Sequence, residues 1–275
     1  MRTTKTDAGV VSYDVRGRGD AAILFNHSST SSLAWSELFL ETLAAKLTVV
    51  TVDYRGTGHS SLGSTPFSLL DLAADGRAVL QQERIRRATV IGTSMGGAVA
   101  QEFALAFPEQ VAVLVLMGTF GGQSRFLPPD ATVLKLVEEF LPRWTEHGKI
   151  EWWRRLLPTV YGAMFLKEHE DLALELELKG SRFTTSETIA RHGAAVSAFE
   201  LYERLPSISA PTLIVHGAED PIIPARNGEI LATRIPDSEY IELKDVGHLP
   251  AVERPLEVAD RVLRFAHENG VRLRS

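Results

Sequence analysis

Residues 88–108 read ATVIGTSMGGAVAQEFALAFP, and they are the most informative part of the chain. Its first four residues form a short apolar, β-branched run typical of a buried strand, and the residues after Gly96 stay compatible with a helix until Pro108. Between them lies Gly92-Thr93-Ser94-Met95-Gly96, a G-x-S-x-G pentapeptide that also occurs by chance in glycine-rich turns. A sharp strand-to-helix turn would lift the serine hydroxyl clear of the sheet. The stretch therefore predicts a nucleophile elbow centred on Ser94.

Two downstream loops offer the partners that a nucleophilic serine needs. In hydrolases a histidine takes the serine proton, a carboxylate orients that histidine, and the chain order is Ser, acid, His. Thr212–Gly217 has the pattern of a buried strand with Asp220 in the loop after it, and Ser238–Leu243 alternates like a strand with His248 in the loop after it. Parallel strands end at one edge of a sheet, so we expect Ser94, Asp220 and His248 to converge there.

With these motifs the chain resembles the α/β-hydrolase fold superfamily, from about residue 10 to about residue 265. The stretch 53–60, DYRGTGHS, is similar to the D-x-R-G-x-G-x-S turn of that family, and Met95-Gly96-Gly97 is similar to its esterase and lactonase branch. The resemblance implies Ser94 as nucleophile, Asp220 as acid and His248 as base. Glu219 is the alternative acid. Asp220, however, stands at the fourth place of the stretch 217–220, where the family has its acid.

The loop at residues 26–29, NHSS, departs from the family's pattern, which often has His-Gly at this point. Two registers are open, and either Ser28 or Ser29 donates the first backbone N–H to the oxyanion; the spacing to Trp35 favours Ser28. We expect the N–H groups of Met95 and Ser28 to form the oxyanion hole. His27 is expected to brace this loop or to face the pocket. The asparagine-containing loop also resembles that of 3-oxoadipate enol-lactonases and related small-ester hydrolases.

The order of strand and helix patterns predicts an α/β fold, with a mostly parallel sheet flanked by helices. This alternation stops between residues 121 and 206. Apolar residues at 133, 136, 137, 140 and 141 follow helical spacing. Residues 172–178, LALELEL, have strand period, but they are strong helix formers and favour a helix. We therefore expect a hydrolase core at 1–120 and 207–275, and a helical cap at 121–206.

Bulky side chains are concentrated in the expected cap, which in the family covers the active site. Most should form the core of the cap, and a few should line the substrate pocket. We expect the cap to control specificity and not chemistry. The candidate pocket residues are His27, Phe120, Trp144, Trp152, Phe183 and Leu249.

Composition limits the classes of function. The formal net charge of −6 argues against binding to nucleic acid or to anionic membranes, and the absence of cysteine excludes disulfides, thiolate catalysis and zinc–sulfur sites. The first residues have no apolar leader pattern, and no run of about 18 apolar residues occurs, so a cytoplasmic location is expected. Histidines and carboxylates show no metal-binding spacing, so neither metal nor cofactor is expected. No pattern indicates an oligomeric state.

The sequence therefore favours an enzyme that hydrolyses a small carboxylic ester or lactone through an acyl-enzyme intermediate. Epoxide hydrolases and haloalkane dehalogenases of this fold use an aspartate nucleophile, and carbon–carbon bond hydrolases often carry a Gly-Pro-Gly loop that is absent from residues 26–32. Cofactor-free haloperoxidases share the triad and stay an alternative. So does a non-catalytic ligand receptor on the same scaffold, because such receptors can retain the triad.

Overall fold

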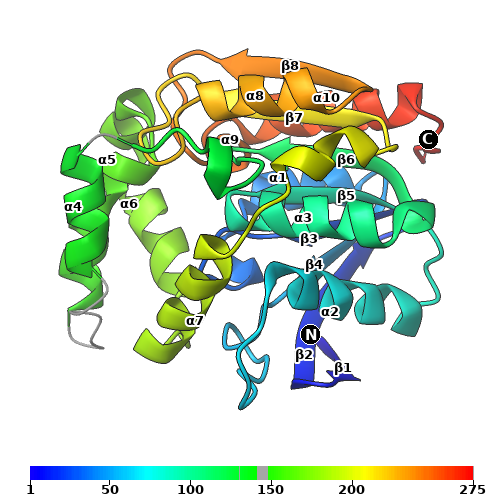
Figure 1. Cartoon of the computed structure of the whole chain (residues 1–275), viewed down its shortest axis with the longest axis horizontal. Coiled ribbons are helices and arrows are strands. Elements are labelled where there is room, and N and C mark those ends of the chain that lie inside the picture. The colour runs from blue at the N-terminus through cyan, green and yellow to red at the C-terminus, as the bar shows by residue number, and fades with distance from the viewer. Residues whose placement is uncertain (130, 141–147, 275) are drawn as a thin grey trace.

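An eight-stranded sheet forms the centre of the part of the chain that the structure, a computed structural model, describes: residues 1–129, 131–140 and 148–274 (Figure 1). The strand order is β1-β2-β4-β3-β5-β6-β7-β8. β2 pairs antiparallel with both of its neighbours, β1 and β4, and the other five pairs are parallel, so the predicted fold class is confirmed. The strands are β1 (Arg2–Thr6), β2 (Gly9–Gly17), β3 (Ala21–Phe25), β4 (Thr48–Val52), β5 (Ala88–Thr93), β6 (Val111–Met117), β7 (Thr212–Gly217) and β8 (Ser238–Leu243).

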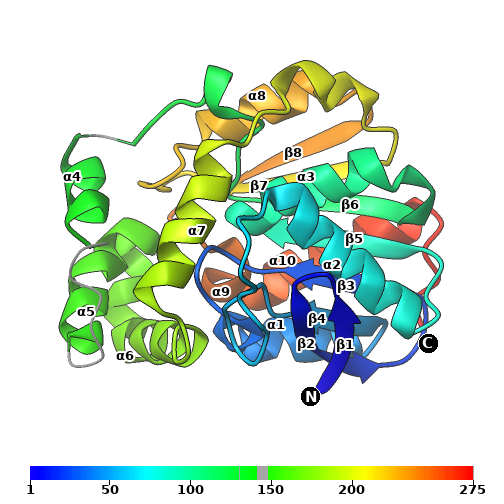
Figure 2. The same ribbon diagram turned by 60° about the horizontal axis from the view of Figure 1, so that its bottom comes forward.

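Helices cover both faces of the sheet (Figures 1 and 2). Because side chains alternate along a strand, Ile23 packs into a cluster with α2 and α3, and its neighbour Leu24 packs into a second cluster with α1 and α10. These two clusters make the strands apolar on both sides, as the unbroken apolar runs predicted. One layer contains α2 (Leu69–Gln82), α3 (Met95–Ala106) and α8 (Arg226–Arg234). The other contains α1 (Glu37–Ala44), α9 (Pro250–Glu253) and α10 (Pro255–Glu268).

We call residues 121–206 the helical insertion, and its four helices extend beyond one end of the sheet (Figure 2). Its helices are α4 (Ala131–Phe140), α5 (Lys149–Val160), α6 (Ala163–Gly180) and α7 (Ser186–Ser197). The helix expected at 172–178 is confirmed within α6, because leucine, alanine and glutamate favour that conformation. A third apolar cluster joins α5 and α6 to Leu249, which directly precedes α9 of the core, and to Val252 within α9.

Two elements near the N-terminus differ from the expectation. β1 has the sequence RTTKT and lies at the sheet edge with mostly exposed side chains, so it carries no apolar alternation that would have predicted it. By sequence, residues 33–46 suit a helix, but α1 begins only at Glu37, because the Ser36 side chain caps the helix start by accepting from the Phe39 N–H. Short 3₁₀ turns lie at Ser32–Ala34, Pro108–Gln110, Gln123–Arg125 and Tyr202–Ser207.

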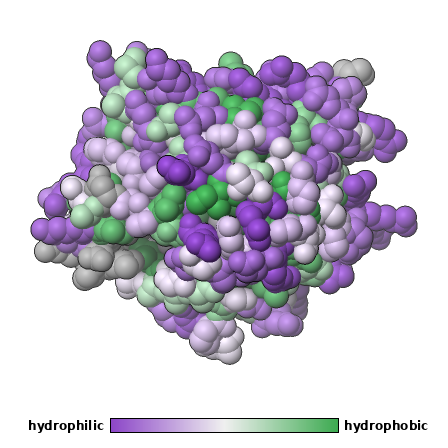
Figure 3. All heavy atoms as spheres, turned by 45° about the horizontal axis from the view of Figure 1, so that its top comes forward, coloured by the Kyte–Doolittle hydropathy of each residue, from purple (hydrophilic) through white to green (hydrophobic). Residues whose placement is uncertain are grey.

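Polar side chains cover most of the face seen in Figure 3, and apolar side chains gather in a small group near its centre. Among the helices of the described residues, none has both the length and the apolar character needed to cross a bilayer.

Candidate active site

Ser94 lies at the turn between β5 and α3, as expected of a nucleophile elbow. Its backbone has φ +55° and ψ −123°, a conformation that residues other than glycine rarely adopt. The turn is held on both sides, since the Ser94 N–H donates to the Met117 carbonyl at 2.9 Å and Thr119 Oγ1 donates to the Ser94 carbonyl at 2.8 Å. Strain of this kind persists only where the surrounding contacts fix it, and it occurs often at functional sites.

The two glycines of the pentapeptide are required by close backbone contacts. A Cβ atom at Gly92 would lie 2.0 Å from the Gly96 carbonyl oxygen, and one at Gly96 would lie 2.1 Å from the Phe25 carbonyl oxygen. Neither distance is possible for a side chain, and backbone atoms cannot move aside without breaking the sheet. The motif is therefore set by the packing of β3, β5 and α3 against one another.

His248 and Asp220 lie next to each other in the loops after β8 and β7. His248 Nδ1 is 2.7 Å from Asp220 Oδ2, and both side chains are almost wholly buried. Asp220 Oδ1 accepts the N–H groups of Ile222 and Ile223 at 3.0 and 2.8 Å. The neighbouring Glu219 is exposed. The geometry thus pairs His248 with Asp220 rather than with Glu219.

Electrostatics favour charge on this pair. Burial alone would raise the pKa of Asp220, but His248 and His216 beside it hold that pKa down at about 2. Burial would likewise lower the pKa of His248, but the Asp220 carboxylate outweighs burial and holds it above its usual value of 6.5. Asp220 therefore stays ionised near neutral pH and favours the imidazolium form of His248.

A second histidine contacts the same carboxylate. His216 Nε2 lies 2.7 Å from the Ile223 carbonyl oxygen and 3.2 Å from Asp220 Oδ2, so its ring proton is on Nε2. By sequence alone, His216 lies at the end of a strand pattern and suits a structural role, and its contact with Asp220 was not predicted. Its position at the end of β7, four residues before the acid, is the signal that could have indicated it.

Ser94 and His248 open onto a common pocket of about 270 Å³ between the core and the helical insertion. Core residues supply its polar end, where Ser94, His248 and the loop at 27–29 lie. The insertion supplies most of its walls. The remaining lining residues are Trp153, Leu156, Thr159, Val160, Glu177, Ile189, Gly193 and Ile222.

Ser28 and Ser29, in the loop after β3, both line this pocket, but their backbone N–H groups differ in whether they are already bound. The Ser29 N–H donates to His192 Nδ1 at 3.1 Å, and burial lowers the pKa of His192 to about 4, so this ring is neutral and can accept. Within the described part of the chain, the Ser28 and Met95 N–H groups have no hydrogen-bond partner. Of the two registers left open by the sequence, the one with Ser28 as donor fits these contacts.

Several residues expected in the pocket lie elsewhere. Phe120 packs against Phe126 and Phe199 in the core, with ring centroids 4.7 and 5.6 Å away. Leu249 is buried in the cluster between the insertion and α9, and Trp152 is buried on α5 beside Arg155. Phe183 is 45% exposed and contacts His59 outside the pocket. Trp144 falls outside the described residues. Of the expected pocket residues that the structure describes, His27 alone lines the pocket.

The position of Trp152 has a geometric cause. Aromatic content marks a residue as apolar, but the direction of a side chain depends on which helix face meets the core. On α5 the pocket face carries Trp153, Leu156 and Val160, at helical spacing i, i+3 and i+7. Trp152 is one residue out of this register. Glu177 was also missed, although a carboxylate on the buried face of α6 is itself a sign of a paired charge.

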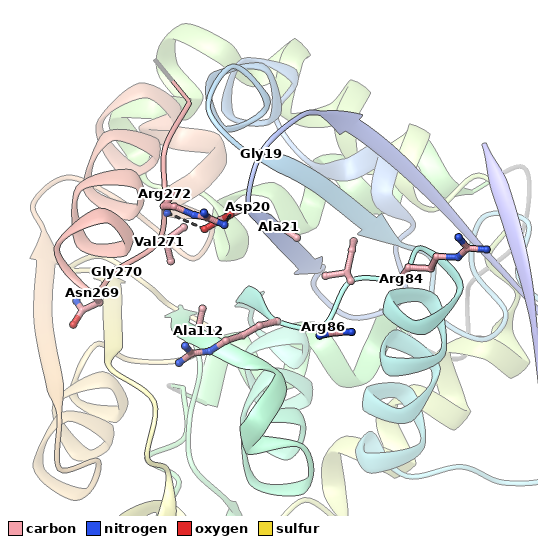
Figure 4. A pocket seen from close by; sticks show the side chains of 12 residues that line it. Gly19, Asp20, Ala21, Arg84, Arg86, Ala112, Asn269, Gly270, Val271 and Arg272 are labelled. Atoms are coloured by element: carbon pink, nitrogen blue, oxygen red, sulfur yellow. Dashed lines mark hydrogen bonds and ion pairs between the residues drawn. The ribbon is translucent and has the colours of Figure 1, made fainter.

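A second and larger pocket, of about 530 Å³, lies around the beginnings of β3 and β6 and the C-terminal segment (Figure 4). Figure 4 shows Arg272 directed at Asp20, 3.3 Å away, and Arg84 directed away from the hollow. Its lining residues, all within the described chain, include no serine, histidine or cysteine. Size alone therefore does not identify the reactive site. Across the described residues, no group of three or more metal-binding side chains is placed to hold an ion.

Comparison with known proteins agrees with this architecture. The family model of the alpha/beta hydrolase fold matches residues 21–255. The chain belongs to this family. A poly(3-hydroxyalkanoate) depolymerase of Ectopseudomonas oleovorans is 30% identical over 239 residues, covering 84% of this chain and 78% of its own. A 3-oxoadipate enol-lactonase of Acinetobacter baylyi is 27% identical, covering 89% and 88%. A solved esterase from Thermogutta terrifontis shares the fold, with a TM-score of 0.84 at 21% identity, covering 98% of this chain and 99% of its own.

Proposed function

We propose that this α/β-hydrolase cleaves a small carboxylic ester or lactone with Ser94 as nucleophile, His248 as base and Asp220 as acid. The observation that carries the proposal is the placement of a strained serine and a carboxylate-bound histidine on one pocket. The two curated relatives described above are named as a depolymerase of a polyester and as an enol-lactonase, which supports carboxylic ester hydrolysis.

The reaction proceeds in two steps. His248 takes the proton of Ser94 as Ser94 Oγ attacks the carbonyl carbon, and the backbone N–H groups of Met95 and Ser28 stabilise the oxyanion. His248 then gives its proton to the leaving alkoxide, and an acyl-enzyme forms. In the second step His248 activates water, and the acyl group is released as an acid. Asp220 keeps the imidazole in the required tautomer throughout.

The pocket favours a substrate with a neutral, apolar acyl or alcohol group. Leu156, Val160, Ile189 and Ile222 offer apolar walls, and a volume of about 270 Å³ suits a small molecule. Each histidine and carboxylate among its described lining residues has a partner: His27 lies 3.2 Å from Glu177, and His248 lies 2.7 Å from Asp220. A substrate carboxylate would find no unpaired cation there. The cytoplasmic location expected from the sequence stays a prediction.

A substrate panel tests the proposal. It contains p-nitrophenyl esters of increasing acyl length, five- and six-membered lactones, a halide-plus-peroxide assay and a carbon–carbon cleavage substrate. We expect turnover of short neutral esters or lactones, and little turnover of esters that carry a carboxylate. Turnover only in the last two assays, or tight binding of panel compounds without any turnover, would reject ester hydrolysis.

A further inference from the structure

The loop that carries the Ser28 N–H is held largely by the helical insertion. Thr184 Oγ1 donates to the Ser29 carbonyl at 2.7 Å, and the Ser31 N–H donates to the Gly180 carbonyl at 2.8 Å. The Ser29 N–H donates to His192 on α7. Three of the loop's backbone groups are therefore bound to the insertion and not to the sheet from which the loop emerges.

A buried side-chain pair makes the fourth link. Glu177 of α6 is 0% exposed, and its carboxylate lies 3.2 Å from His27 Nε2 and accepts the Tyr161 hydroxyl proton at 2.8 Å. Burial raises the pKa of Tyr161 well above its usual value, so Tyr161 remains a donor. His27 Nδ1 lies 3.0 Å from Asn26 Oδ1, and the Asn26 amide nitrogen donates to Thr30 Oγ1 and to the Ser31 carbonyl. The His27 ring is thus fixed at both nitrogens.

These contacts determine the number of protons on the pair. Asn26 Oδ1 is an acceptor, so His27 Nδ1 carries a proton. Nε2 faces a carboxylate oxygen, so a proton lies between His27 and Glu177, on one group or the other. In either arrangement the pair has no net charge. The contact is therefore a complete hydrogen bond in a site sheltered from water, where its loss would leave a polar group unpaired.

The His27–Glu177 pair affects the oxyanion hole through the peptide bond between His27 and Ser28. The N–H of Ser28 and the carbonyl of His27 belong to the same planar group, and that carbonyl accepts from Thr30 Oγ1 at 3.1 Å. Fixing the His27 side chain and carbonyl therefore fixes the direction of the Ser28 N–H. A donor displaced by about 1 Å can lower a rate by about 10²-fold.

We propose that Glu177 is a positioning residue that holds the His27–Ser28 peptide, so that the helical insertion sets the rate of the chemical step as well as the fit of the substrate. This inference rests on the proposed function, because it requires Ser28 to donate to an oxyanion. It extends the expectation from the sequence, which gave the insertion a role in specificity alone.

Two substitutions at one position separate positioning from charge. Glu177→Gln can donate from its amide to a neutral His27 and accept from Tyr161, so both hydrogen bonds of the side chain at this position survive. Glu177→Leu keeps the bulk and removes them. On p-nitrophenyl acetate we expect Glu177→Leu to lower kcat by about 10- to 100-fold, with KM changed less than about threefold, since removal of a whole oxyanion donor costs about 10²–10³. Glu177→Gln should stay within about threefold of the wild type.

A transition-state mimic and a matched control complete the experiment. The affinity for a trifluoromethyl ketone, which forms an oxyanion on the enzyme, should fall by the same factor as kcat. Glu175→Gln, on the exposed face of the same helix, should leave both unchanged. Folding is checked by circular dichroism and thermal melting. His27→Ala removes the same contact from the core side, and should reproduce the loss of kcat even where Glu177→Leu does not fold.

The outcomes separate the two proposals. Wild-type enzyme without turnover or serine labelling contradicts the proposed function itself. With an active wild type, an unchanged kcat in folded Glu177→Leu or His27→Ala overturns only the role of Glu177. Equal losses in the glutamine and leucine variants also overturn it, because the charge and not the position would then matter.

Discussion

The core and the helical insertion contribute to the candidate site in different ways. The core supplies the proposed reacting atoms, each just after a strand of the sheet: Ser94 after β5, Asp220 after β7 and His248 after β8. The insertion supplies apolar walls from α5 and α7, and bonds that hold the loop at 27–31. Reacting groups thus depend on local backbone geometry, whereas substrate fit depends on how two separate parts of the chain meet. Substitutions in the two parts should therefore have different kinetic signatures.

Removing the nucleophile should have the largest effect. Ser94→Ala deletes one oxygen at a turn held by backbone contacts, so the fold should survive. Covalent catalysis should not, and we expect kcat to fall by about 10⁵–10⁶, as for loss of a catalytic serine in a related triad. Stopped-flow and steady-state assays on the best ester of the panel measure the loss, and thermal melting checks the fold. A folded variant that keeps a tenth of the activity would remove Ser94 from the chemistry.

Changing the acid should have the second-largest effect. Asp220→Asn keeps a hydrogen-bonding group but favours the wrong tautomer of His248, and should lower kcat by about 10³–10⁴. Glu219→Gln, its exposed neighbour, is the matched control and should change kcat less than about twofold. The same assay compares both variants, and a reversed order of the two losses would mean that the acid is misassigned.

Enlarging the pocket at one wall should change the activity on long acyl esters more than the activity on acetate esters. Leu156→Ala enlarges the pocket next to the insertion, and should change kcat/KM for long acyl esters by up to about 10-fold while sparing acetate esters. Ile150→Ala, exposed on the same helix α5, is the control and should change neither. An equal loss on short and long esters by folded Leu156→Ala would mean that this wall does not discriminate by acyl length.

The smallest expected effect is a shift in the pH dependence of kcat/KM on changing Glu253. His248 must be neutral to act as base, and its pKa is raised, so kcat/KM should fall as pH decreases with a midpoint above 6.5. Glu253 lies against the same loop, accepting the Gly247 and Gly162 N–H groups at 3.0 and 2.9 Å, and burial raises its pKa to about 7. Its charge raises the pKa of His248, so Glu253→Gln should move the midpoint to lower pH. A midpoint that stays fixed or rises contradicts this coupling.

What the sequence could predict also differs between the core and the helical insertion. The strands and the positions of Ser94, Asp220 and His248 were predictable, because apolar runs and strand-end loops are local patterns. β1 was missed because an edge strand with polar side chains has no such pattern. Glu177 was missed for a different reason. Which side of α6 faces the core depends on contacts between residues 150 positions apart, such as Glu177 and His27, and no local pattern encodes those.

Covalent labelling tests the central claim most directly. The wild-type enzyme is treated with a serine-directed fluorophosphonate, and the intact mass, the modified peptide and the remaining activity are measured together, with Ser94→Ala as the control. We predict one adduct per chain, on Ser94, formed in step with the loss of activity, and no adduct on Ser94→Ala. Loss of activity with the label on any other residue, or full activity in a chain labelled at Ser94, would contradict the account.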